Sequence, residues 1–305
     1  MTFISAVIPL LNEERIVSEL IRRVDINLRK ISQDYQIILV DDGSTDSTWK
    51  VIKSESLKNN KISGIKFSRN FGHHYAITAG INSSISEWVV VMDGDLQDRP
   101  EVIPDLYKRA QEGFDVVFVN RINRKDSLFY LMAQKFFYKI LNLLTGLKFN
   151  PKQANFSIIS KKVVDSYRQF GEHSRFYGST IKWLGFSTAS VDAQHGERLS
   201  GRPSYTIKKR FKLAFDIILS YSERPLKFAV TLGLFFSALS ILFVCWIAYK
   251  AYFSEFSVLG WPSIIFSIFF TTGITLIILG IMGLYLGRIY NQVKQRPLYI
   301  IELTL

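Results

Sequence analysis

The sequence predicts an α/β domain with a doubly wound parallel sheet, followed by two helices that span a membrane. Over the first 120 residues, short apolar runs alternate with helix-like stretches, which is the pattern of a sheet covered by helices on both faces. Acid-rich motifs follow two of these runs directly. Near the C-terminus, two stretches of 22 and 27 residues contain no charge, and each is long enough to cross a bilayer.

Five apolar runs suit the buried strands of such a sheet: Ile4–Ile8, Ile37–Val40, Ile62–Phe67, Trp88–Met92 and Val116–Val119. Helix-like stretches lie between them, near residues 13–30, 46–57, 72–83 and 101–112. Because strand and helix alternate, each helix is expected to connect two parallel strands. Ligands of doubly wound sheets bind beyond the carboxyl ends of the strands, and the polar motifs fall there.

Composition and charge narrow the class of protein. The chain has 305 residues, 48% hydrophobic and 21% charged, which excludes a disordered or collagen-like protein. The net charge of +12 is regional: residues 1–120 carry 14 Lys and Arg against 17 Asp and Glu, residues 121–224 carry 19 against 7, and the remainder 5 against 2. The single cysteine, Cys245, cannot form an intramolecular disulfide, so nothing indicates an oxidising compartment.

The uncharged stretches 228–249 and 261–287 are predicted to form a transmembrane hairpin, because core helices rarely lack a polar face over six turns. Lys and Arg cluster before the first stretch and after the second, whereas the connecting loop holds only Lys250 and Glu255. By the positive-inside rule, both termini are expected to be cytoplasmic. Residues 1–11 are apolar but contain Pro9 and follow no basic region, which indicates a buried strand rather than a signal peptide.

Two basic segments, 128–144 and 205–221, carry apolar residues at helical spacing. The first suits either an interfacial helix or a helix that packs on the core, and the second runs directly into the first span, which favours the membrane interface. Nucleic-acid binding would also account for the basic charge. These charges flank membrane spans, however, where anionic headgroups attract Lys and Arg. We therefore expect the lipid bilayer as a partner and no nucleic acid.

Two carboxylate clusters follow predicted strands. Asp41 and Asp42 come directly after the second strand, and Asp93 and Asp95 come directly after the fourth. A single acidic turn is weak evidence, because many such turns cap helices, but two at strand ends project into one crevice. Carboxylates without nearby His or Cys favour Mg²⁺ or Mn²⁺, which completes its shell with phosphate and water. Since neither a P-loop nor a G-x-G-x-x-G after the first strand is present, a nucleotide-sugar fits better than other nucleotides.

Four motifs occur in the order and spacing seen in glycosyltransferase family 2: Pro9–Glu13 (PLLNE), Asp41–Asp46 (DDGSTD), Arg69–His73 (RNFGH) and Asp93–Glu101 (DGDLQDRPE). With the two spans, the full chain resembles polyprenyl-phosphate glycosyltransferases of the dolichyl-phosphate mannose synthase-like branch, of the bacterial and phage glucosyltransferase type. The resemblance implies a GT-A (Rossmann-like) fold. It also implies transfer of glucose or a related hexose from a nucleotide-sugar, UDP-linked in bacterial members, to polyprenyl (undecaprenyl) phosphate.

The resemblance assigns roles to individual residues. The nucleoside pocket would be lined by Pro9, Asn12, Glu13, Asp41 and Asp42. Asp93 would border the ribose and the metal, while Asp95 and Gln97 would hold Mg²⁺ or Mn²⁺ against the diphosphate. Arg198 and Ser204 would grip the donor diphosphate, and Arg69 or His73 would contact phosphate at the start of the third crossover helix. Arg121 and Arg124 are candidates for the lipid phosphate.

Asn155 departs from the family pattern, because many relatives have a carboxylate at this position, just before a Phe. An amide cannot accept a proton, so Asn155 can orient a substrate but cannot act as a general base. A phosphomonoester is largely ionised at neutral pH, and a single in-line displacement by its oxygen would invert the anomeric carbon. The resemblance thus implies Asp95, Asn155 and Arg198 as the catalytic residues.

Two alternatives remain beside this hypothesis. Asn155 motivates a non-catalytic nucleotide-sugar-binding or assembly subunit of a cell-envelope glycosylation complex. A processive polysaccharide synthase is disfavoured, because the Q-x-x-R-W signature is absent and only two spans are predicted.

The expected organisation is a GT-A catalytic domain over 1–204, a juxtamembrane amphipathic helix over 205–226, a transmembrane hairpin over 227–290 and a cytoplasmic tail over 291–305. The protein would lie in the inner (cytoplasmic) membrane with its catalytic domain in the cytoplasm. The tail is apolar enough to pack against another surface, which leaves a homo-oligomer open.

Overall fold

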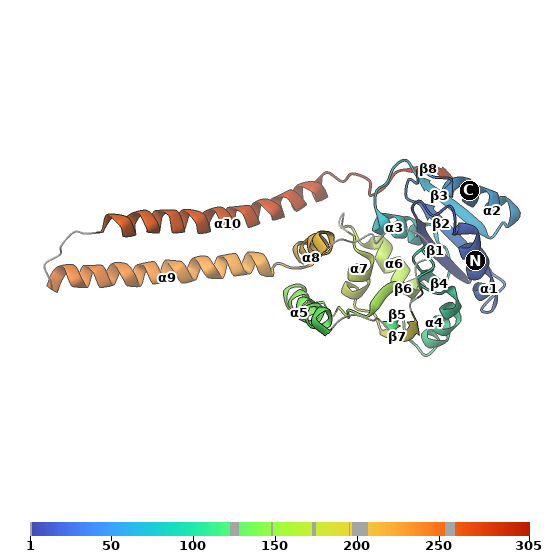
Figure 1. Cartoon of the computed structure of the whole chain (residues 1–305), viewed down its shortest axis with the longest axis horizontal. Coiled ribbons are helices and arrows are strands. Elements are labelled where there is room, and N and C mark those ends of the chain that lie inside the picture. Colours follow the sequence, from blue (N-terminus) through green and yellow to red (C-terminus); the bar gives the residue numbers. More distant parts are fainter. Residues whose placement is uncertain are drawn as a thin grey trace. The chain divides into compact units, whose positions relative to one another are not determined.

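The computed structural model describes residues 2–122, 128–147, 149–172, 175–194, 196, 207–253 and 260–305. The chain forms two compact units (Figure 1). We call the first the α/β unit; it comprises Met1–Leu143, Leu147–Arg210 and Arg296–Leu305. The second, the helical unit, comprises Leu144–Gly146 and Phe211–Gln295.

The described part of the α/β unit contains one eight-stranded sheet in the order β7-β5-β6-β4-β1-β2-β3-β8. Its strands are β1 (Ile4–Leu10), β2 (Tyr35–Asp41), β3 (Ile62–Phe67), β4 (Trp88–Val91), β5 (Val116–Ile122), β6 (Gln153–Ser160), β7 (Thr188–Gln194) and β8 (Ile301–Thr304). β1 pairs in parallel with β2 and β4, and β2 with β3. β6 is antiparallel to β4 and β5, and β8 is antiparallel to β3. The five predicted strands are confirmed, but the sheet is mixed rather than wholly parallel.

Helices cover both faces of this sheet, as a doubly wound fold requires. They are α1 (Val17–Arg29), α2 (Thr48–Lys58), α3 (His73–Ser83), α4 (Ile103–Ala110), α6 (Lys161–Gln169) and α7 (Tyr177–Trp183), with a 3₁₀ turn, η1 (Pro100–Val102), before α4. The core against one face contains side chains of α1, α2 and α4, and the core against the other contains side chains of α3, α6 and α7. α5 (Leu128–Thr145) begins in the α/β unit.

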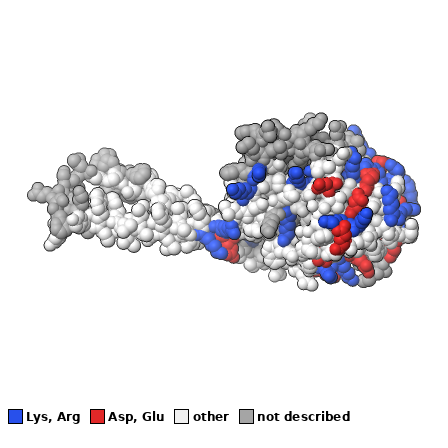
Figure 2. Space-filling view, turned by 90° about the horizontal axis from the view of Figure 1, so that it is seen from below, with Lys and Arg blue, Asp and Glu red and all other residues white. Residues whose placement is uncertain are grey.

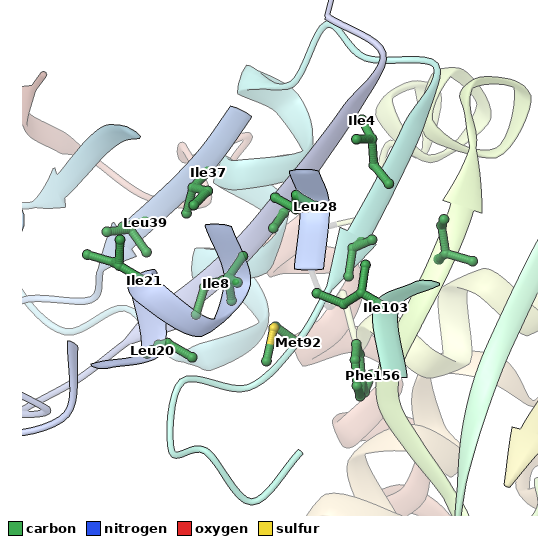
Figure 3. Packing of buried hydrophobic residues seen from close by; sticks show 14 of the residues in the cluster. Ile4, Ile8, Leu20, Ile21, Leu28, Ile37, Leu39, Met92, Ile103 and Phe156 are labelled. Carbon is green, nitrogen blue, oxygen red and sulfur yellow. The ribbon is translucent and has the colours of Figure 1, made fainter. Parts of the chain in front are cut away.

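Alternation along the strands divides the side chains between the two cores. In β1, Ile4 and Ile8 face the layer of α1 while Val7 faces the layer of α3. Figure 3 shows side chains of α1, β2 and α4 meeting those of β1. Ile4, Ile8 and Leu20 are fully buried, and each contributes roughly 1.5–3 kcal/mol through removal from water. This packing fixes the strand ends that carry the polar motifs.

The last strand is formed by the end of the chain. β8 returns after the second long helix and pairs with β3, with Lys66 opposite Leu303. Lys66 forms an ion pair of 2.7 Å with Glu302, and the ring of Tyr299 stacks on Phe67 with centroids 5.0 Å apart. The segment 291–305, expected to form only a tail, therefore contributes a strand to the α/β unit.

The helical unit contains the two long helices of the chain. α8 (Ile207–Tyr221) precedes α9 (Arg224–Phe253) and α10 (Trp261–Val293). Windows over Arg224–Phe243 and Ser267–Val293 are long and apolar enough to cross a membrane, with 6% and 0% of their residues buried. Figure 2 shows these helices as mostly white, without Lys, Arg, Asp or Glu over most of the visible length.

Contacts within the helical unit join α8 to α10. Arg288 of α10 donates hydrogen bonds to Asp216 Oδ1 at 3.2 Å and to Ser220 Oγ at 2.5 Å, and the Tyr285 hydroxyl donates to the carbonyl oxygen of Ser222 at 2.8 Å. Polar side chains of the basic segment are thus bonded to the end of the second apolar helix. Both predicted amphipathic segments are helical; their position at a membrane interface stays a prediction.

Candidate functional site

The polar motifs meet at one edge of the sheet. β1, β2, β3, β4, β5 and β7 run in the same direction, so their carboxyl ends share that edge, and the antiparallel β6 begins there. The motif residues that follow β1, β2, β3 and β4 therefore lie along one rim, as predicted. β7 and the start of β6 add to this rim; neither strand was predicted from the sequence, although Asn155 of β6 was expected at the site.

The loops after β1 and β2 are bonded to each other. Asn12, in a left-handed conformation with φ 57°, accepts a hydrogen bond from the Thr45 amide at 2.8 Å, and its own amide donates to Ser44 Oγ at 2.9 Å. The Glu13 amide donates to Thr48 Oγ1 at 2.9 Å. These bonds give the predicted nucleoside-pocket residues Asn12 and Glu13 a fixed backbone.

Asp41 and Asp42 are buried, with exposed fractions of 0% and 2%. The Asp42 carboxylate accepts hydrogen bonds from the Phe71 amide at 2.8 Å and the Gly72 amide at 3.0 Å, just before α3. Asp41 Oδ1 accepts one from the Ser44 amide at 3.0 Å. Burial raises the pKa of both carboxyl groups. The pair thus fixes the two loops that follow β2 and β3; contact with a nucleoside stays a prediction.

Two glycines are required where these loops approach each other. Gly43 has φ +72°, and a Cβ on it would lie 2.4 Å from the carbonyl carbon of Arg69. A Cβ on Gly94 would lie 2.4 Å from Leu10 Cδ2 and 2.9 Å from the Pro9 oxygen. No side chain fits at such distances. Gly94 therefore lets the loop between Asp93 and Asp95 lie against the end of β1.

Asp93 lies between two cationic groups. Its Oδ1 is 3.2 Å from His73 Nε2 and its Oδ2 is 3.9 Å from Arg121 Nη2. Burial would raise the pKa of Asp93, but the attraction of His73 and Arg121 outweighs burial and lowers it. Burial likewise would lower the pKa of His73, but the carboxylates of Asp93, Asp42 and Asp95 raise it. His73, expected to contact phosphate, is thus a neighbour of the predicted metal ligand.

Asp95 and Gln97 lie on a tight turn. The Gln97 amide donates to Asp95 Oδ1 at 3.1 Å, and Leu96 between them has φ 58°. The Gln97 carbonyl oxygen accepts from the Gly196 amide at 2.9 Å, which ties the turn to the loop after β7. The two predicted metal ligands Asp95 and Gln97 therefore lie two residues apart on one turn.

The donor set fits a hard divalent cation that also binds substrate. Asp93 Oδ1 is buried and lies 3.2 Å from His73 Nε2, but a carboxylate oxygen carries more than one lone pair, so one remains available for a cation. The described residues contain no group of three or more His, Cys, Asp and Glu that could hold a metal. Mg²⁺ is usually bound by one or two carboxylates together with phosphates and water, so two aspartates and an amide oxygen suit it.

Arg121 makes a contact that the sequence did not indicate. Its Nη2 lies 3.0 Å from both carboxylate oxygens of Asp98, and its Nε donates to Asp98 Oδ1 at 3.2 Å. Asp98 is only 3% exposed, although the sequence assigned it no role beyond its place in the acidic motif. The strand-end position of Arg121 and the acidic motif were both visible, but their pairing depends on β6 lying between β4 and β5.

The remaining predicted residues divide into two groups. Extending the β4–β6 register, in which Val91 pairs with Ser157, puts Asn155 level with Asp93. The Arg69 guanidinium lies over the Phe71 ring, 4.2 Å from its centroid, and Pro9 is buried within β1. Arg124, Arg198 and Ser204 lie outside the described residues.

His74, adjacent to His73, has a structural environment. Its Nδ1 accepts a hydrogen bond from the Tyr177 amide at 3.4 Å, and its ring contacts Phe176 edge-on. Burial lowers the pKa of His74 to about 3, so its ring is neutral at physiological pH. Neutral Nδ1 can accept the amide hydrogen, and protonated Nδ1 cannot. His74 therefore joins α3 to α7, as expected of a structural histidine.

A mixed α/β sheet with acidic groups at its strand ends agrees with the GT-A glycosyltransferase fold that the motifs predicted, and comparison with known proteins identifies the family. The model of glycosyl transferase family 2 matches residues 5–168, which is more than half of the chain. The chain belongs to this family and is a glycosyltransferase, as the four motifs predicted.

Relatives match over nearly the full length. The chain is 35% identical to the uncharacterized glycosyltransferase YkcC of Bacillus subtilis over 299 residues, covering 98% of this chain and 93% of that protein. It is 32% identical to the bactoprenol glucosyl transferase of Shigella phage SfII, covering 98% and 97%. Similarity to these relatives therefore includes the two long apolar helices as well as the α/β unit.

Solved structures of the same fold are more distant in sequence. Glucosyl-3-phosphoglycerate synthase from Mycobacterium tuberculosis in complex with phosphoglyceric acid superposes with a TM-score of 0.52 at 19% identity, covering 72% of this chain and 80% of that one. The same enzyme with Mn²⁺, UDP and phosphoglyceric acid gives a TM-score of 0.51 at 20% identity, covering 72% and 76%. This likeness concerns the fold.

Proposed function

We propose that this protein is an inverting, metal-dependent glycosyltransferase that moves a hexose, glucose in the first instance, from a UDP-sugar to polyprenyl phosphate at the cytoplasmic face of the inner membrane. The observation that carries the proposal is the full-length similarity to a phage bactoprenol glucosyl transferase, apolar helices included. The carboxylates at the rim of the sheet supply the donor side of the reaction.

The donor diphosphate needs positive charge near the rim, because it leaves as an anion. A bound Mg²⁺ or Mn²⁺ would neutralise that charge, and Asp93, Asp95 and Gln97 would hold it. The glucosyl-3-phosphoglycerate synthase of the same fold was solved with Mn²⁺ and UDP, which agrees with this donor set. Arg198 and Ser204 are proposed to bind the diphosphate, and Pro9, Asn12, Glu13, Asp41 and Asp42 to surround the nucleoside, with Arg69 at the phosphates.

The acceptor would be the anionic phosphate oxygen of a polyprenyl phosphate. It forms a bond to the anomeric carbon while the bond from that carbon to the diphosphate breaks, so UDP leaves and the configuration inverts. No strong base is needed, because the phosphate is already largely ionised. Asn155 can therefore serve by orienting the acceptor, and the main contribution of the protein is alignment of the reactants. Arg121 and Arg124 are proposed to contact the lipid phosphate.

The membrane location follows from the charges around the apolar helices. Arg224 and Lys227 precede the apolar part of α9, and Arg288, Lys294 and Arg296 lie at and beyond the end of α10. The positive-inside rule then puts both termini and the α/β unit in the cytoplasm. Donor and lipid phosphate would meet on that side of the bilayer.

Membranes containing the protein, incubated with labelled UDP-glucose and undecaprenyl phosphate, test the proposal. We expect a glycolipid whose mass equals that of the lipid phosphate plus one hexose, and no product with EDTA. Membranes carrying Asp95→Ala provide the matched control. Donor binding without any glycolipid, across a panel of nucleotide-sugars, would instead support a non-catalytic subunit.

A further inference from the structure

The ion pair between Arg121 and Asp98 lies beside the proposed cation site. Asp98 is five residues after Asp93 on the loop that follows β4, and Arg121 is near the end of β5. Arg121 is about one-fifth exposed and Asp98 is almost fully buried. A buried charge needs a partner, because burial without one costs several kcal/mol. The ion pair therefore stabilises both buried charges.

Arg121 is shared unequally between two carboxylates. Three contacts of 3.0–3.2 Å join it to Asp98, whereas its nearest atom is 3.9 Å from Asp93, beyond hydrogen-bonding distance. The Nε and Nη2 groups form the fork that grips a carboxylate in two places. Asp98 thus holds the guanidinium by this fork and keeps it at a distance from Asp93.

We propose that Asp98 is a positioning residue for the cation site: it retains Arg121, so that the Asp93 carboxylate stays available to a divalent cation. This inference rests on the proposed metal dependence. Without the charge of Asp98, the nearest carboxylate to Arg121 among the residues that the structure describes is that of Asp93. An arginine bonded to Asp93 would compete with the cation for the same oxygens.

The inference makes the effects of two substitutions non-additive. Asp98→Asn should raise the Mn²⁺ concentration needed for half-saturation by about tenfold or more, because an arginine that forms a charge-assisted hydrogen bond to Asp93 competes with the cation. The double variant Asp98→Asn with Arg121→Gln removes the competitor. Its Mn²⁺ affinity should return to within about threefold of wild type. If the pair only maintained the shape of the loop, the second substitution would not restore affinity.

Isothermal calorimetry on the purified full chain measures this effect, with Mn²⁺ titrated in the presence of saturating UDP. Glu101→Gln is the matched control, because it removes a carboxylate three residues along the chain that pairs with Arg23 of α1 at 2.6 Å. We expect Mn²⁺ affinity to be unchanged in that variant. A melting temperature for every variant separates loss of binding from loss of folding.

The outcomes separate this inference from the proposed function. Wild-type protein that binds no Mn²⁺ with UDP would overturn the metal dependence and this inference with it. Normal Mn²⁺ affinity in Asp98→Asn would overturn the positioning role alone. Should Asp98→Asn fail to fold, the double variant still decides: affinity near wild type supports the inference, and a tenfold loss contradicts it.

Discussion

Removing the ring of Tyr299 should loosen the C-terminal strand from the sheet. The ring lies nearly parallel to that of Phe67, at 13° and 5.0 Å between centroids, and its hydroxyl accepts a hydrogen bond from Asn82 at 3.1 Å. Truncating a fully buried aromatic residue to Ala costs about 3–5 kcal/mol. Tyr299 is only partly buried, so we expect Tyr299→Ala to cost about 2 kcal/mol.

For a unit of this size, that loss lowers the melting temperature by about 4–8 °C. Circular dichroism of the purified protein in detergent measures the shift. Ile300→Ala is the control, because the neighbouring side chain is 52% exposed and its carbonyl bond to the Ser68 amide does not need the side chain. Its shift should stay within about 2 °C. Equal shifts for both variants, or none for Tyr299→Ala, would refute the docking of β8 through this ring.

Three further outcomes are expected. Gly94→Ala should lower activity by about tenfold or more and reduce the melting temperature. The added methyl group would lie 2.4 Å from Leu10 Cδ2 and would shift the loop that carries Asp93 and Asp95. An unchanged Mn²⁺ requirement and an unchanged rate would contradict this. Asp95→Ala should abolish turnover at every Mn²⁺ or Mg²⁺ concentration while the melting temperature stays close to wild type, and a near-normal rate would remove Asp95 from the metal site. Burial lowers the pKa of His74 from 6.5 to about 3. Between these values the unfolded chain binds a proton that the folded chain does not. The free energy of unfolding should therefore fall as the pH drops below about 6.5, by at most about 1.4 kcal/mol per pH unit. The dependence measured by urea unfolding should be weaker in His74→Gln, and equal slopes would argue against it.

Hydrophobic pattern was sufficient to predict the central part of the sheet. The runs that became β1, β2 and β4 are buried on both faces, so each is continuously apolar and stands out from the helices beside it. The edge of the sheet at which ligands bind could also be predicted from the alternation of strand and helix, because the carboxyl ends of parallel strands share one edge. The order of the strands in the sheet could not be predicted in this way, since the sequence of a strand does not specify which strands pair with it.

The two outermost strands, β7 and β8, could not be predicted from the sequence, for a different reason. β7 has the sequence TASVDAQ, and its residues are half-buried or exposed throughout, so no apolar run marks it. β8 has four exposed residues and pairs with β3, more than 230 residues earlier. Such strands exist because a neighbouring backbone supplies hydrogen bonds, and that neighbour is known only from the fold.

The two acidic clusters looked alike in sequence, yet the structure gives them different surroundings. Asp42 is buried and bonded to backbone amides of the loop before α3, and Gly43 lets the loop after β2 lie against Arg69 and Asn70 of that same loop. Asp93 instead has cationic side chains as neighbours: its Oδ1 lies 3.2 Å from His73 Nε2 and its Oδ2 lies 3.9 Å from Arg121 Nη2. A carboxylate saturated by amides stabilises a loop, while one with a free electron pair can bind a cation. Asp42 therefore fixes the rim, whereas Asp41 Oδ2, buried without a hydrogen bond from the described residues, and the Asp93 carboxylate keep capacity for a ligand or a cation.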